Sequence, residues 1–175
     1  MIESLYSKIN ESKFDAFQYI LNDLCYEYNI AYQEGCIWLE LGFKLEKNNY
    51  FNRQAYVVLI YASELFLKSI LMKNNINFSR THDLFSLFNL VNDECKAIIK
   101  KKIEIDKLEI VDKDNNIIGY LNDFEDYLKF ISNYFVDLRY DFEKINSNNS
   151  TIIPTNFINK FVFNLYEFCK RELEK

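Results

Sequence analysis

The hydrophobic residues of this chain recur at intervals of three and four, the spacing that places them on one face of an α-helix. The pattern predicts amphipathic helices over residues 13–28, 31–46, 83–91, 95–107, 124–143 and 157–173. Residues 50–73 differ, because their apolar side chains cover nearly the whole circumference of a helix. A helix of that kind is typical of the centre of a bundle, where other helices surround it.

The same pattern predicts core positions and helix starts. Ser79 or Thr81 is expected to cap the helix over residues 83–91. Thr155, which follows Pro154, is expected to cap the last helix. We expect the core to include the apolar side chains of Val58, Ile60, Leu65, Leu71, Leu87 and Phe135.

The periodicity changes over residues 108–120, where two short β-branched runs flank Asp114, Asn115 and Asn116. Such runs on either side of turn-forming residues favour a small β-hairpin or an ordered loop. The prediction is therefore an all-α fold, an antiparallel, up-and-down bundle of five to seven helices with a small hairpin insert near residues 108–120. We expect one domain over residues 1–175, because no linker or internal repeat interrupts the chain.

Composition narrows the classes of function. Only 3 Gly and 1 Pro occur in 175 residues, which argues against turn-rich β folds and glycine-rich phosphate loops. A net charge of −5 argues against a bulk basic field for nucleic acid or anionic membrane. The 4 cysteines form no C-x-x-C motif, and the first residues lack the apolar run of a signal peptide. The uncharged apolar run over residues 55–63 is too short for a membrane span, so we expect a cytoplasmic protein with reduced thiols.

Metal and nucleophile chemistry finds little support in the sequence. A single His cannot supply a zinc site or a di-metal carboxylate bundle. No phosphate-loop motif and no G-x-S-x-G motif occurs. We therefore expect neither a metal nor another cofactor.

Three polar residues stand out against the apolar helices. Glu64 lies within the most apolar segment, where a carboxylate requires a partner or a water-filled cleft. Lys68, four residues later, lies on the same helical face and could pair with it. Arg139 could instead pair with Glu64 across the bundle, or hold a phosphate. Each pairing has a purely structural interpretation as well as a functional one.

His82 is the only ordinary acid–base candidate near neutral pH, because it is the only histidine in the chain. It precedes a predicted helix and could equally serve as a loop-stabilising hydrogen-bond donor. The basic stripe that includes Lys100 and Lys101 could contact a nucleic-acid backbone, or could be a solvated helix face.

The middle of the chain resembles the HEPN superfamily, named for higher eukaryotes and prokaryotes nucleotide-binding. The matching stretches are AYVVLIYASELFLKSILMK, which contains Glu64 and Lys68, and RTHDLFSLFNLV, which contains His82. The later LRYDFE resembles the helix of the family that bears an arginine, here Arg139. The resemblance covers residues 30–144.

The resemblance implies a bundle of four or more helices, usually homodimeric. Many members are metal-independent endoribonucleases of toxin–antitoxin, abortive-infection and other defence systems. Their active site uses an Arg-x(4–6)-His motif at the dimer interface. This chain departs from the motif, because no His follows Arg139. The role of that His is vacant unless Glu143 or His82 fills it.

We therefore expect an HEPN-like binding or regulatory dimer without competent ribonuclease activity, in a phage-defence or toxin–antitoxin setting. The partners implied are a second copy, RNA or a nucleotide, and an antitoxin or nucleotidyltransferase. The expected ligand-binding residues are Glu64, Lys68, Arg139, Lys100 and Lys101. The alternative is an endoribonuclease with an altered site built from Arg139, Glu143 and His82. A third hypothesis is a structural partner subunit that exposes aromatic helix faces.

Overall fold

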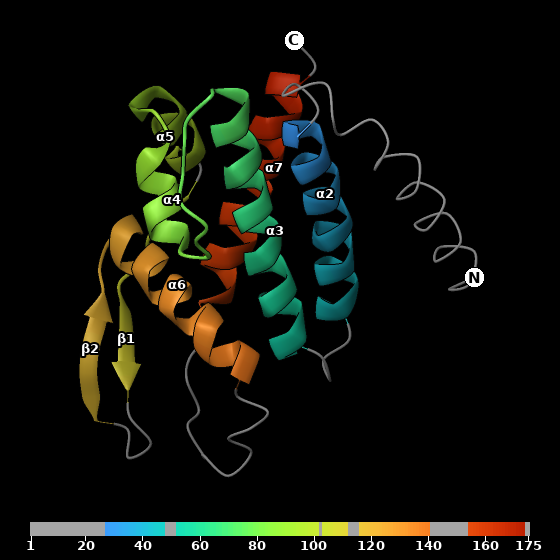
Figure 1. Ribbon diagram of the computed structural model, residues 1–175. Coiled ribbons are helices and arrows are strands. Elements are labelled where there is room, and N and C mark those ends of the chain that lie inside the picture. Colours follow the sequence, from blue (N-terminus) through green and yellow to red (C-terminus); the bar gives the residue numbers. More distant parts are fainter. Residues whose placement is uncertain (1–26, 48–51, 102, 112–115, 141–153, 174–175) are drawn as a thin grey trace.

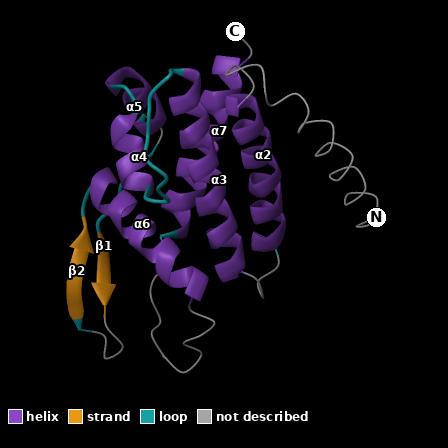
Figure 2. Ribbon diagram, in the orientation of Figure 1, coloured by secondary structure: helices purple, strands orange, loops and turns teal. Residues whose placement is uncertain are grey.

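The computed structural model describes residues 27–47, 52–101, 103–111, 116–140 and 154–173. This part of the chain is mostly helical, with one small antiparallel hairpin, which confirms the predicted all-α bundle (Figures 1 and 2). Its elements are α2 (Glu27–Glu46), α3 (Asn52–Lys73), α4 (Leu84–Leu90), α5 (Asp93–Lys100), β1 (Leu108–Val111), β2 (Ile117–Leu121), α6 (Phe124–Tyr140) and α7 (Thr155–Leu173).

Helix α3 is the centre of the bundle, as its apolar circumference predicts. It packs against α2, α4, α6 and α7 (Figure 1). By length and composition alone, Arg53–Lys73 is apolar enough to cross a membrane. However, 72% of that apolar window is buried inside the bundle. The apolar surface of α3 is therefore covered by other helices, as in a core helix.

The core draws on every described helix from α2 to α7. Of the predicted core residues, Ile60, Leu65, Leu71 and Leu87 are buried, whereas Val58 is half-buried. The side chain of Phe135 lies outside the described residues. A cluster of aromatic rings joins α4, α6 and α7, with centroid distances between 4.9 and 6.0 Å; its members are Phe88, Phe124, Tyr127, Phe157 and Phe161.

Two glycines let α2 approach α3 closely. A β-carbon at Gly35 would lie 2.7 Å from Cε1 of Phe66, and one at Gly42 would lie 2.5 Å from Cδ2 of Leu59. Both partner side chains are fully buried on α3. The two helices run antiparallel side by side (Figure 1). Any larger residue at these glycines would force a packed side chain aside.

Several predicted boundaries are wrong. Helix α5 ends at Lys100 and does not continue to residue 107. Residues 103–106 alternate between half-buried isoleucines and exposed acids, a period of two that suits extended chain rather than helix. The predicted helix over residues 13–28 lies almost wholly outside the described residues.

The caps also differ from the prediction. Asp83, and neither Ser79 nor Thr81, is the N-cap of α4, because it directly precedes the helix and its Oδ1 accepts from the N–H of Phe85. Thr155 is the first helical residue of α7, and the carbonyl of Pro154 accepts from the N–H of Ile158. Proline therefore stands at the position before the helix, where its missing N–H costs nothing.

The predicted hairpin insert is present. Strands β1 and β2 pair antiparallel, with Leu108 opposite Leu121 and Ile110 opposite Gly119. The register shifts between Ile110 and Val111. Leu121 is buried against the bundle and anchors the base of the hairpin.

Candidate functional site

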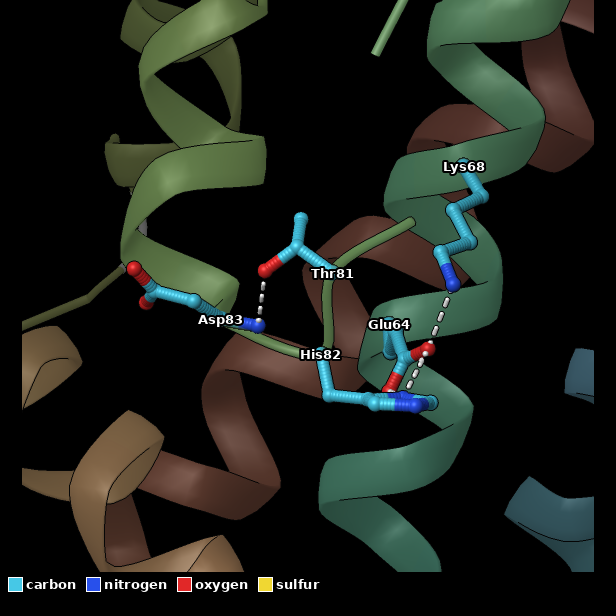
Figure 3. A network of polar contacts seen from close by, with 5 residues as sticks. All are labelled: Glu64, Lys68, Thr81, His82 and Asp83. Carbon is cyan, nitrogen blue, oxygen red and sulfur yellow. Dashed lines mark hydrogen bonds and ion pairs between the residues drawn. The ribbon is translucent and has the colours of Figure 1, made fainter. Parts of the chain in front are cut away.

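Glu64 is the centre of the candidate site. It projects from the most apolar helix, α3, and its side chain is only 1% exposed. The Nζ of Lys68 lies 2.6 Å from Oε1 of Glu64, so the predicted pairing along the helix is confirmed (Figure 3). A buried carboxylate needs such compensation, because unpaired burial of a charge is strongly unfavourable.

His82 supplies the second partner of this carboxylate. It lies in the segment that precedes α4, and its Nδ1 is 2.9 Å from Oε1 and 3.1 Å from Oε2 of Glu64 (Figure 3). The ionised carboxylate can only accept, so Nδ1–H donates and the neutral ring keeps its lone pair on Nε2. The His82 side chain is 56% exposed. The imidazole is therefore exposed to solvent, while its contact with Glu64 fixes its tautomer and orientation.

The turn around His82 is held on its other side by the start of α4. The N–H of Asp83 donates to Oγ1 of Thr81 at 3.0 Å. The N–H of Phe85 donates to Oδ1 of Asp83 and to Oγ of Ser132 on α6, each at 3.0 Å. Ser132 is buried and also donates to the carbonyl of Leu128. The imidazole is thus positioned by α3, α4 and α6 together.

The stability of this turn depends on pH through the Asp83 carboxylate. Burial raises the pKa of its carboxyl, but hydrogen bonds from Ser86, Ser132 and Phe85 outweigh burial and leave the pKa below its ordinary value of 3.8. A carboxyl with a lowered folded-state pKa stabilises the fold at pH values above its ordinary pKa. This contribution disappears as pH falls through the folded-state pKa.

We expect Asp83→Asn to be less stable than wild type at neutral pH, by less than about 1 kcal/mol, because asparagine is an equally good cap without the charge. The difference in the free energy of unfolding between the variant and the wild type should become smaller as pH falls from 7 to 3. Urea unfolding at several pH values measures it. A difference that stays constant or grows in acid would contradict the assignment of this carboxylate.

The other predicted site residues do not join this cluster. The Nζ of Lys100 lies 4.8 Å from the ring centroid of Phe124 and 5.7 Å from that of Phe88, so this cation packs on the aromatic core. Lys101 is exposed just beyond the end of α5. The side chain of Arg139 and the whole of Glu143 lie outside the described residues. The predicted Glu64–Arg139 pair therefore stays a prediction.

Two of the thiols are unsuited to nucleophilic chemistry. Burial raises the pKa of the Cys36 and Cys169 thiols, which keeps them protonated at neutral pH. Within the described ranges, no group of three or more His, Cys, Asp and Glu side chains could hold a metal ion. Cys25 lies outside these ranges.

Sequence reasoning missed the contact between Glu64 and His82. The two residues are 18 positions apart, and the sequence offers Lys68 or Arg139, not His82, as the partner of Glu64. Periodicity cannot bring them together, because the contact depends on how the chain turns between α3 and α4. The only signal that linked them was that both belong to the pattern of the resembling family.

The comparisons with known proteins bear on this site. The model of the HEPN domain matches residues 44–153. The match includes Glu64, Lys68 and His82, and it leaves most of α2 and all of α7 outside, although both helices contribute to the core. Searches of curated proteins and of solved structures found no match.

Proposed function

Because the chain belongs to the HEPN domain family, we propose that it binds a nucleotide or an RNA through the site formed by Glu64, Lys68 and His82. The observation that carries this proposal is the contact between the buried Glu64 carboxylate and Nδ1 of His82. It occupies Nδ1 and leaves Nε2 of this exposed ring to accept a proton or to donate to a phosphate oxygen.

The charges of the site suit an anion when the imidazole is protonated. Glu64 contributes one negative charge, and Lys68 and protonated His82 contribute one positive charge each, which leaves the cluster with one positive charge. Phosphate groups are bound by such charge-assisted donors. Since the whole chain carries −5, this local cluster rather than a general basic field would attract the ligand.

Calorimetric titration with AMP, ATP and a short single-stranded RNA tests the proposal. We expect His82→Ala to weaken binding about tenfold or more, because one charge-assisted hydrogen bond contributes about 1.5–3 kcal/mol. Lys96→Ala on α5 is a matched control. The Nζ of Lys96 donates to the carbonyl of Asn89 and to Oδ1 of Asp93, and it makes no contact with Glu64 or His82. Failure of the wild type to bind any of the three ligands would refute the proposal.

We further propose that this member acts as a binding or regulatory module without competent ribonuclease activity, because no His follows Arg139 at the spacing of the family motif. The setting would be a cytoplasmic phage-defence or toxin–antitoxin system. The partners would be a second copy and an antitoxin or nucleotidyltransferase. Arg139→Ala is then expected to reduce stability more than it reduces any activity.

One observation favours an endoribonuclease as the second candidate. A carboxylate that orients an imidazole with a free Nε2 is the arrangement of a general base, here directed at a 2′-hydroxyl. Arg139 would stabilise the negative charge that develops on the phosphate, and Glu143 would supply the second proton-transfer group. Growth arrest on expression, lost in both His82→Ala and Arg139→Ala, would support this enzyme over a binding module.

A further inference from the structure

A groove of about 240 Å³ lies between the segment that precedes β1 and the first turn of α7. Its floor is aromatic, because Tyr127 of α6 and Phe157 of α7 line it, and their ring centroids lie 4.9 Å apart. Leu108, the first residue of β1, adds an apolar side chain. The hydroxyl of Tyr127 donates to the carbonyl of Asp106 at 2.7 Å, which ties the floor of the groove to one of its walls.

Two carboxylates, those of Glu104 and Asp106, line that wall. They alternate with half-buried isoleucines, so both lie on the exposed side of the extended segment. Glu104 pairs with Lys160 at 3.4 Å, but its side chain is 89% exposed, and ion pairs so open to solvent are weak. Asp106 makes no ion pair within the described residues. The wall therefore keeps negative charge that a cationic ligand can neutralise.

Another wall is the first turn of α7, where Thr155 and Asn156 line the groove. The first N–H groups of a helix have no acceptor within that helix. A bare metal cation gains nothing from such donors, and a free anion is repelled by Glu104 and Asp106. A peptide suits both walls, because its backbone carbonyls accept from N–H groups and its basic side chains pair with carboxylates.

The size and the backbone of the groove also favour a peptide. Pockets for drug-sized molecules occupy about 300–1,000 Å³. This groove is smaller, so it suits one or two side chains rather than a whole nucleotide. Within the described residues, the N–H and C=O groups of Glu104 and Ile105 make no hydrogen bond to other backbone groups. An extended segment with free backbone groups can pair with a peptide strand.

We propose that this groove binds an extended basic segment of a partner protein. One apolar side chain of that segment lies over Tyr127 and Phe157, and flanking arginines pair with Glu104 and Asp106. Arginine is favoured over lysine, because its planar guanidinium stacks on rings and binds a carboxylate through two donors. The net charge of −5 attracts such a segment over longer distances.

Fluorescence anisotropy with a short, fluorescein-labelled peptide of alternating arginine and leucine tests the proposal. We expect the wild type to bind this peptide. A peptide of alternating arginine and serine should bind about tenfold more weakly, because burial of the apolar side chain is lost. A peptide of alternating glutamate and leucine should not bind, since its carboxylates meet those of Glu104 and Asp106.

A pair of double variants isolates the groove from the general attraction between unlike charges. Glu104→Gln/Asp106→Asn should weaken binding of the arginine–leucine peptide about fivefold or more. Asp93→Asn/Glu94→Gln is the matched control, because both acids are exposed on α5 and neither lines the groove. The two double variants carry the same net charge, and the control should bind like the wild type.

Asn156 offers a test at a single exposed position of the groove. Asn156→Arg adds a cation to the wall and should weaken binding of the arginine–leucine peptide. Asn156→Glu adds a third carboxylate and should strengthen it. Either charge changes the stability of the first turn of α7 only slightly, and circular dichroism checks that both variants fold.

The inference goes beyond the proposed function and does not depend on the ligand of the Glu64–His82 site. A wild type that does not bind the arginine–leucine peptide overturns it, as does an equal loss of affinity in both double variants. Equal affinity for the serine peptide overturns the apolar contact with the floor. If light scattering shows that Asn156→Arg abolishes a dimer of the wild type, a second copy occupies the groove and the proposal is wrong. None of these results alters the nucleotide titration, so the two proposals fail separately.

Discussion

Glu64→Ala is expected to lower the free energy of unfolding by about 1–3 kcal/mol and to weaken nucleotide or RNA binding about tenfold or more. The carboxylate accepts from both Lys68 and His82 while its own side chain is 1% exposed. Its removal leaves the Lys68 ammonium, whose side chain is 18% exposed, without this counter-charge. It also releases the imidazole from its fixed orientation. Urea unfolding and calorimetric titration measure the two effects.

The comparison of Glu64→Ala with Glu64→Leu/Lys68→Leu separates stability from function. Replacement of a buried ion pair by apolar groups of similar volume is often neutral or stabilising. The double variant should therefore recover stability while binding stays weak. If Glu64→Ala left the affinity unchanged, the carboxylate would have no part in orienting His82 for the ligand. That result would contradict the proposed binding site.

Gly35→Val is expected to lower the free energy of unfolding by about 1–3 kcal/mol, the usual range for overpacking a filled core. Even the first added carbon would lie 2.7 Å from the fully buried ring of Phe66. Valine has a better helix propensity than glycine, which offsets only part of this cost. The loss should appear as a lower Tm in thermal unfolding.

Gly119→Ala is the control for this prediction. Its β-carbon would make only an ordinary contact with Ile110, at 3.8 Å. We expect its Tm to equal or exceed that of the wild type, since alanine also reduces the entropy of the unfolded chain. Equal stability of Gly35→Val and the wild type would show that α2 can move away from α3 without cost.

The sequence predicts those parts of the structure that depend on neighbours along the chain. The central position of α3 follows from its apolar circumference, and the Glu64–Lys68 pair follows from a spacing of one helical turn. The hairpin follows from the change in hydrophobic periodicity over residues 108–120. Each of these features is determined by residues within a few positions of one another.

The parts that the sequence does not predict depend on how distant segments meet. The contact of His82 with Glu64 requires the turn between α3 and α4, which is held by Ser132 from α6. Lys100 belongs by sequence to a basic stripe, yet it packs on two aromatic rings contributed by α4 and α6. The early end of α5 reflects the burial of Ile103 and Ile105 beside the core, which overrides the helical tendency of the lysines.

The solitary imidazole offers a direct spectroscopic view of the site. Since the chain contains 1 His, every ring resonance in a histidine-selective NMR spectrum belongs to His82. Nδ1 contacts the Glu64 carboxylate and Nε2 does not, so the two ¹⁵N signals should report the tautomer separately. Addition of a phosphate-bearing ligand should shift chiefly the Nε2 signal, without any assignment of the rest of the protein.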